Sequence, residues 1–105
     1  MVAVSSRTGE RAAAFAAGHG IPAKFGSAVE MAGHDLDAVY VASTNQAHLD
    51  DALPFLEAGT AVLCEKPLTL DGAQAVRMAE AARQSGAFLM EAMWMVFQPA
   101  FALME

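Results

Sequence analysis

The sequence predicts an α/β protein, a parallel β-sheet with helices packed on both of its faces. Short apolar segments alternate with helix-like segments along all 105 residues, and this alternation is typical of parallel strands joined by helices. The strand-like segments are also continuously apolar, as in residues 38–42. A strand that is buried on both faces has that composition.

The first element is a strand that begins within residues 2–7. A helix follows within residues 8–22, with Thr8 as its expected N-cap. Its end is marked by residues that stop helices, namely Gly18, Gly20 and Pro22. Residues 23–33 then predict a very short strand and a helix of one or two turns, with Ser27 as the N-cap.

The clearest strand lies within residues 35–44, and the next helix lies within residues 45–59. The helix has an apolar stripe at helical spacing and Gly59 at its end. Because Pro54 has no N–H to donate to residue 50, the regular helix either begins near Asp50 or kinks. The stripe consists of Leu49, Leu53 and Leu56.

A strand over residues 60–65 is followed by a helix over residues 71–86, with Asp71 as the N-cap and Gly86 at the end. Residues 87–95 form another apolar segment and predict the last strand. A further helix begins within residues 98–105. We expect one small domain, because 105 residues suffice for no more.

The composition excludes several classes of protein. The formal net charge is −6, whereas proteins that bind nucleic acids carry clustered basic residues. No apolar segment reaches the roughly 18 to 20 residues that span a bilayer. The single cysteine cannot form an internal disulfide, and no Cys/His set has the spacing of a metal site. We therefore expect a cytoplasmic protein without a metal ion.

Polar residues follow the predicted strands at their carboxyl ends, where open parallel sheets bind their ligands. Ordinary solvated loops are the alternative, but four such clusters on one predicted edge favour a site. The clusters are Ser5-Ser6-Arg7, Ser43-Thr44-Asn45, Glu65-Lys66-Pro67 and residues 91–94.

Four segments, "VAVSSRT", "VASTNQAH", "AGTAVLCEKPLTL" and "MEAMWMVFQP", resemble the Gfo/Idh/MocA oxidoreductases. The similar branch contains glucose–fructose oxidoreductases and dihydrodiol dehydrogenases. The resemblance implies a Rossmann-type NAD(P)-binding domain followed by a substrate domain. It also implies an enzyme that transfers a hydride between the nicotinamide and a sugar, polyol or diol. The complete enzyme is expected to be a homo-oligomer.

The chain departs from the family in its two outer parts. The first strand and the G-x-G-x-x-G turn would precede Val2, and the substrate domain would follow Glu105. Thr44 and Val96 stand where a proline and an arginine are common. We therefore expect residues 1–105 to be a partial dinucleotide-binding domain, with the missing strand between those at Val2 and Val39. The alternative is a truncated, non-catalytic interaction protein that keeps the Rossmann-like fold.

Ser6 and Arg7 end the strand that meets the adenosine ribose in Rossmann domains. An acid there selects the 2′-hydroxyl of NAD, whereas an arginine accommodates the 2′-phosphate of NADP. The chain has the arginine and no acid, so we expect NADP, with NAD as the other possibility. The alternative for Arg7 is a solvated side chain near the start of a helix.

The resemblance assigns the segment from Ser43 and Thr44 through Asn45 and His48 to the dinucleotide, with Asn45 near a ribose. The start of a helix lies here, and helix N-termini favour anions. Asn45 serves equally well as a plain N-cap. For His48 a packed or surface histidine is as good an interpretation as a cofactor contact.

The "EKP" sequence stands at the exit of an apolar strand. In the family this lysine is catalytic and the acid before it shapes the cofactor site, so the resemblance makes Lys66 catalytic and Glu65 and Pro67 neighbours of the cofactor. An amine at a strand's carboxyl end can exchange a proton with the substrate oxygen. A surface Glu65–Lys66 ion pair is the alternative. A cis bond before Pro67 is also possible.

Trp94 is either a wall of the substrate pocket or a core residue.

Overall fold

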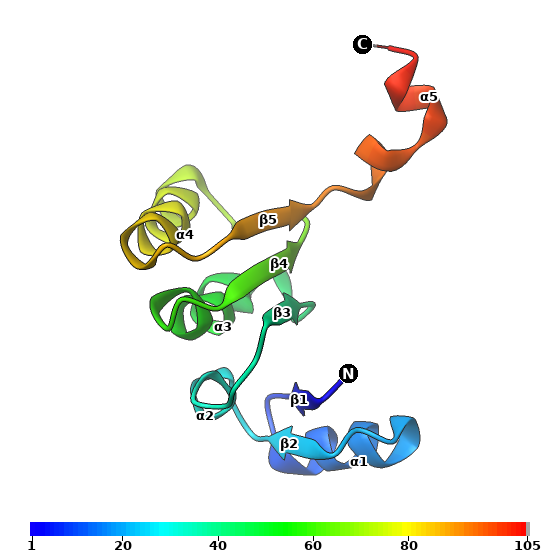
Figure 1. Cartoon of the computed structure of the whole chain (residues 1–105), viewed down its shortest axis with the longest axis vertical. Coiled ribbons are helices and arrows are strands. Elements are labelled where there is room, and N and C mark those ends of the chain that lie inside the picture. Colours follow the sequence, from blue (N-terminus) through cyan, green and yellow to red (C-terminus); the bar gives the residue numbers. More distant parts are fainter. Residues whose placement is uncertain (105) are drawn as a thin grey trace.

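The computed structural model describes residues 1–104. Strands and helices alternate in the order that the sequence predicts, and Figure 1 follows them along the chain. The strands are β1 (Ala3–Ser5), β2 (Ala23–Phe25), β3 (Ala38–Val41), β4 (Ala61–Glu65) and β5 (Leu89–Ala92). The helices are α1 (Gly9–His19), α2 (Ala28–Ala32), η1 (Asn45–Ala47), α3 (His48–Glu57), α4 (Gly72–Ser85), η2 (Trp94–Phe97) and α5 (Pro99–Ala102), of which η1 and η2 are 3₁₀-helices.

The strands form two parallel sheets. β1 pairs with β2, and β4 lies between β3 and β5. In Figure 1 β1 lies between β2 and β3, but β1 and β3 belong to different sheets and form no ladder with each other in the described residues. The Rossmann-like α/β class is confirmed, with the interruption at the predicted place.

Local hydrogen bonds start the helices at the predicted caps. Thr8 Oγ1 accepts from the backbone N–H of Arg11 at 3.2 Å, and Ser27 Oγ accepts from that of Glu30 at 3.2 Å. Asp71 Oδ1 accepts from that of Gln74 at 2.8 Å. The three N-caps are confirmed because each needs only residues three positions apart.

α3 begins at His48, close to Asp50, which was one of the two alternatives for its start, and it contains Pro54. Its leucine stripe packs into the core, with Leu49 and Leu53 each 8% exposed and Leu56 fully buried. Phe55 is buried beside them. α3 and α4 pack against each other, and in Figure 1 both lie on the same side of β3, β4 and β5.

The expectation of cover on both faces fails for this three-stranded sheet. Along β3 and β4 the buried residues Val39, Val41, Val62 and Cys64 alternate with exposed ones, since Tyr40 is 55% exposed and Leu63 38% exposed. α3 and α4 lie on one side, and the other face is open in residues 1–104. An apolar strand predicts that both of its faces are covered by other parts of the protein. It does not show which segment covers each face.

The last strand is shorter than predicted, because β5 ends at Ala92. The Met93 N–H donates to the carbonyl of Glu91 at 2.8 Å, and this tight turn ends the ladder. Trp94 therefore lies in η2 and not in a strand. The final helix begins at Pro99, as expected for a proline in the first turn.

Among residues 1–104, no helix combines the length and apolar character that a membrane crossing requires.

Candidate functional site

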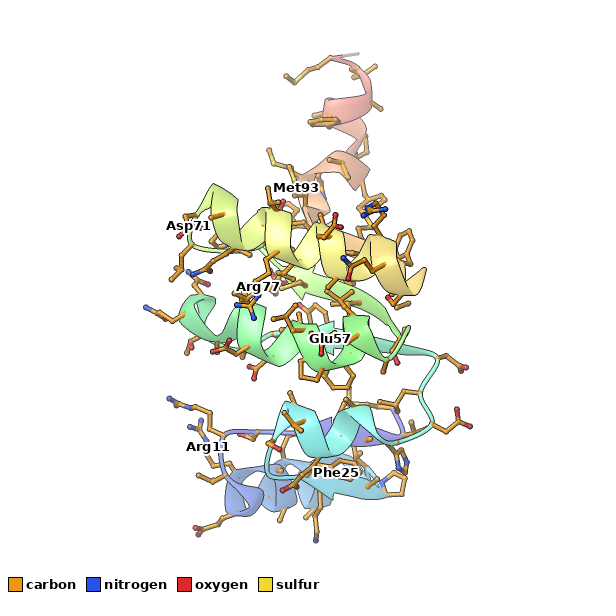
Figure 2. All side chains as sticks on the ribbon, turned by 90° about the vertical axis from the view of Figure 1, so that its left-hand side faces the viewer. Arg11, Phe25, Glu57, Asp71, Arg77 and Met93 are labelled. Carbon is orange, nitrogen blue, oxygen red and sulfur yellow. The ribbon has the colours of Figure 1, made fainter. Side chains whose placement is uncertain are left out.

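The predicted site residues lie where strands lead into helices. β1 leads into α1, β3 leads through η1 into α3, and β4 leads into α4. In Figure 2, Arg11 from the first turn of α1 and Asp71, the N-cap of α4, both lie at the left-hand side of the molecule. The carboxyl ends of parallel strands and the N-termini of helices are favoured places for anionic ligands. We therefore take this side as the candidate site.

The end of β1 borders a hollow of about 230 Å³. Ser6 lines it and donates its backbone N–H to Phe25 at 3.3 Å. Arg7, the next residue along the chain, is exposed. Arg11 also lines the hollow, although no motif in the sequence indicated it. The available signal was its position in the first helical turn, three residues after the Thr8 cap.

Ser43, Thr44 and Asn45 are exposed after β3. Thr44 precedes η1 without a capping bond from its side chain, and Asn45 is the first residue of that 3₁₀-helix. Ala47 is the residue that precedes α3. The interpretation of Asn45 as a plain N-cap is therefore wrong, because the 3₁₀ turn delays the start of α3 to His48.

His48 is the one buried polar or charged residue of the described chain, with no exposed surface. Its Nδ1 lies 2.8 Å from the carbonyl oxygen of Pro67, and its Nε2 lies 3.2 Å from that of Ser43. The ring thus joins the segment after β3 to the turn after β4. Because both nitrogens face backbone carbonyls, His48 is packed between these two segments.

Glu65 ends β4 and is held by two donors. The Tyr40 hydroxyl donates to Oε1 at 2.5 Å, and the backbone N–H of Lys66 donates to Oε2 at 3.1 Å. The bond from Tyr40, followed by that from Lys66, lowers the pKa of the Glu65 carboxyl. In the described residues the only ion pair joins Arg83 to Glu80. The structure therefore does not contain the surface Glu65–Lys66 pair that was the alternative.

The turn after β4 exposes Lys66 while its neighbours are anchored. Lys66 and Pro67 are exposed, and the peptide bond between them is cis, as the sequence allowed. The backbone N–H of Leu68 donates to Glu91 Oε1 at 2.7 Å. The carbonyl of Leu68 lies 3.9 Å from Cys64 Sγ. Two further residues support this turn: Glu91, which belongs to the predicted cluster at residues 91–94, and Tyr40, which no motif in the sequence indicated.

Cys64 is fully buried in β4. Burial, and then the charges of nearby carboxylates, raise the pKa of the Cys64 thiol to about 11. The thiol is therefore protonated near neutral pH, and a thiol rather than a thiolate is a poor nucleophile. Cys64 therefore serves as a small buried hydrophobe.

The open face of the three-stranded sheet carries an apolar groove of about 430 Å³. Glu65 stands among otherwise apolar and aromatic side chains in its lining. Trp94 is 64% exposed and borders this groove, so it is not a core residue within residues 1–104. The lining residues are Tyr40, Leu63, Glu65, Met90, Ala92, Trp94 and Phe97.

The side chains on the candidate side suit the two ends of a dinucleotide. Ser6 and Arg11 line the hollow at β1, and Arg7 is exposed and directly follows Ser6 in the sequence. Hydroxyl and guanidinium groups can bind a phosphate through charge-assisted hydrogen bonds. The exposed side chains of residues 43–45 and Lys66 lie at the next strand ends. No G-x-G-x-x-G turn occurs in the sequence, so the residues present fit the ends of the dinucleotide and not its pyrophosphate.

Comparisons with known proteins agree with this geometry. The chain is 43% identical over 102 residues to the trans-1,2-dihydrobenzene-1,2-diol dehydrogenase of Xenopus laevis, covering 96% of this chain and 31% of that protein. It is 44% identical over 102 residues to the NADP⁺-dependent scyllo-inositol 2-dehydrogenase IolU of Bacillus subtilis, with the same coverage. The chain thus spans about a third of the length of these curated relatives.

Solved structures share the fold. An NAD-binding oxidoreductase from Klebsiella pneumoniae superposes with a TM-score of 0.89 at 33% identity, covering 98% of this chain and 28% of that one. The 3-ketoreductase KijD10 from Actinomadura kijaniata, in complex with TDP-benzene and NADP, gives a TM-score of 0.84 at 34% identity, covering 99% and 33%. The profile of one family matches residues 1–93. The chain belongs to that family, GFO_IDH_MocA, the oxidoreductases with an NAD-binding Rossmann fold.

Proposed function

We propose that this chain is the partial cofactor-binding domain of an NAD(P)-dependent oxidoreductase in which Lys66 is the catalytic acid–base residue. The observation that carries the proposal is the turn after β4. Side chains hold its backbone at the Lys66 N–H, the Pro67 carbonyl and the Leu68 N–H, while the Lys66 side chain is exposed. A fixed backbone beneath a free amine suits a group that must meet a substrate in one position.

The proposed chemistry divides between the cofactor and the chain. When bound, the nicotinamide supplies or accepts the hydride. In the oxidation of an alcohol, the neutral Lys66 amine takes the hydroxyl proton as the O–H bond breaks. In the reduction of a carbonyl, the Lys66 ammonium returns that proton to the oxygen. Glu65, through its bond to the Lys66 N–H, keeps the strand exit in place.

We propose NADP as the preferred cofactor. The support is the hollow at the end of β1, which Ser6 and Arg11 line, and the exposed Arg7 that directly follows Ser6. A guanidinium can bind the 2′-phosphate in two parallel hydrogen bonds. Ser43, Thr44 and Asn45 are proposed to contact the dinucleotide nearer the nicotinamide.

The names of the relatives support a small sugar, polyol or diol as the substrate class. We propose that Trp94 lines the substrate side of the site, since it is exposed beside the groove. The complete protein is further proposed to be a cytoplasmic homo-oligomer.

The test uses the full-length protein, meaning this chain with any residues that its gene encodes on either side. NADP⁺ reduction is followed with scyllo-inositol and with trans-1,2-dihydrobenzene-1,2-diol as probe substrates. Lys66→Met is expected to lower turnover roughly 100- to 10,000-fold, the range for loss of an acid–base group. Affinity for NADPH should change little, because other residues hold the dinucleotide.

Lys24→Met is the matched control, because Lys24 is the chain's other lysine and is exposed on β2. The control should keep normal turnover. Near-normal turnover of Lys66→Met would show that Lys66 is a surface charge. A protein that neither binds NADPH nor turns over either probe would instead match the alternative of a non-catalytic interaction protein.

A further inference from the structure

Glu91 makes a contact that its position in a strand does not require. It lies in β5 with Cys64 as its register partner on β4. Its side chain reaches past the end of β4, where Oε1 accepts the backbone N–H of Leu68 at 2.7 Å. The two residues are 23 positions apart in the sequence, and the bond is partly buried.

Leu68 is held at both of its backbone polar groups. Glu91 takes the N–H from β5, and the Cys64 thiol lies 3.9 Å from the carbonyl from β4. Leu68 also packs against the core. Since Lys66 is only two residues earlier, the Glu91 bond fixes one end of the short segment that carries the amine. The other end is fixed by the bond from the Lys66 N–H to Glu65.

We infer that Glu91 is a positioning residue for Lys66, acting through its hydrogen bond to the Leu68 N–H. This inference rests on the proposed function. Glu91 itself exchanges no proton with the substrate. Its carboxylate anchors the far end of the turn, so that the Lys66 amine stays where the substrate oxygen arrives. A charged acceptor makes a stronger bond to an N–H than a neutral one does.

Three variants of the full-length protein separate this role from others. Glu91→Gln keeps an oxygen that can accept the Leu68 N–H, whereas Glu91→Met has similar length and no such acceptor. Glu57→Met makes the same replacement at the exposed last residue of α3, at the position labelled in Figure 2. It controls for the general effect of losing a carboxylate.

Turnover with the two probe substrates is measured together with the KM for NADP⁺. Glu91→Met should lower kcat about 10- to 100-fold, because a displacement of about 1 Å can cost that much. The KM for NADP⁺ should stay within about threefold, since Glu91 does not hold the dinucleotide. Glu91→Gln and Glu57→Met should both retain kcat within about threefold of the parent protein.

Hydrogen exchange at the Leu68 amide is a readout that does not depend on activity. The amide should exchange about tenfold faster or more in Glu91→Met and should stay protected in Glu91→Gln. If Glu91→Met does not fold, the Gln variant decides alone: retained kcat and protection support the inference, and a folded Gln variant that loses either overturns it.

The contrary outcomes are distinct. Equal losses of kcat in Glu91→Gln and Glu91→Met would mean that the charge and not the hydrogen bond matters, and unchanged kcat in both would leave Glu91 without a role. Either result overturns the inference. The proposed function fails separately, through normal turnover of Lys66→Met. If neither probe is turned over, unchanged exchange at Leu68 in Glu91→Met overturns the inference by itself.

Discussion

The Tyr40 hydroxyl donates a 2.5 Å hydrogen bond to Glu65 Oε1 across 25 residues of sequence. Tyr40 is opposite Leu63 in the ladder between β3 and β4, so Glu65 is its diagonal neighbour on the same face of the sheet. The bond connects the open apolar groove to the residue immediately before Lys66. It also links the ionisation of the two side chains, which makes the contact measurable.

We predict that Tyr40 ionises at higher pH than an ordinary tyrosine and that Glu65→Gln removes most of this shift. The hydrogen bond to Glu65 raises the pKa of Tyr40, and the neighbouring negative charge adds to it. Tyr40 is the single tyrosine among the 105 residues. Its ionisation is followed by the phenolate absorbance as a function of pH, after subtraction of the absorbance of the Tyr40→Phe variant. An unchanged titration curve in Glu65→Gln would contradict the contact.

The same bond predicts how stability changes in acid. The pKa of Glu65 is lowered in the folded protein, so the carboxylate contributes stability above its unfolded pKa, and this contribution is lost as the pH falls through the lowered folded value. In the Tyr40→Phe variant, the free energy of unfolding should therefore depend less on pH in the acidic range. Denaturant unfolding of the parent protein and of Tyr40→Phe at several acidic pH values checks this. The prediction is wrong if the free energy of unfolding depends on pH in the same way in both proteins.

Arg7→Asp should shift the cofactor preference of the full-length protein from NADP towards NAD. The added acid repels the 2′-phosphate and can accept a hydrogen bond from the ribose hydroxyl. The measurement is kcat/KM for both cofactors, with the exposed Arg77→Asp on α4 as the matched control. A change of less than about threefold in the ratio would show that Arg7 does not contact the phosphate.

His48→Phe should destabilise the protein by about 1–3 kcal/mol, because a part-buried carbonyl that accepts an N–H from the ring loses its donor. The two carbonyls that the ring nitrogens face are those of Pro67 and Ser43. His19→Phe is the control, since His19 is exposed at the end of α1, and a surface substitution usually changes stability by at most about 0.5 kcal/mol. Equal unfolding midpoints for the two variants would exclude the joining role of His48.

The features that depend on neighbouring residues could be predicted from the sequence alone. Thr8, Ser27 and Asp71 cap helices because each side chain reaches an N–H three residues later. The order of strands and helices followed from the alternation of apolar segments. The exit of β4 at the "EKP" sequence followed because a charged pair and a proline end an apolar strand.

The distant residues that support the site could be identified only from the folded structure. The partners Tyr40 and Glu65, His48 and Pro67, and Glu91 and Leu68 are 25, 19 and 23 positions apart. Their contacts depend on strand register and on which face each side chain occupies, and a shift of one residue would reverse that face. The open face of β3–β5 was also beyond the sequence, because an apolar strand does not reveal which segment covers it.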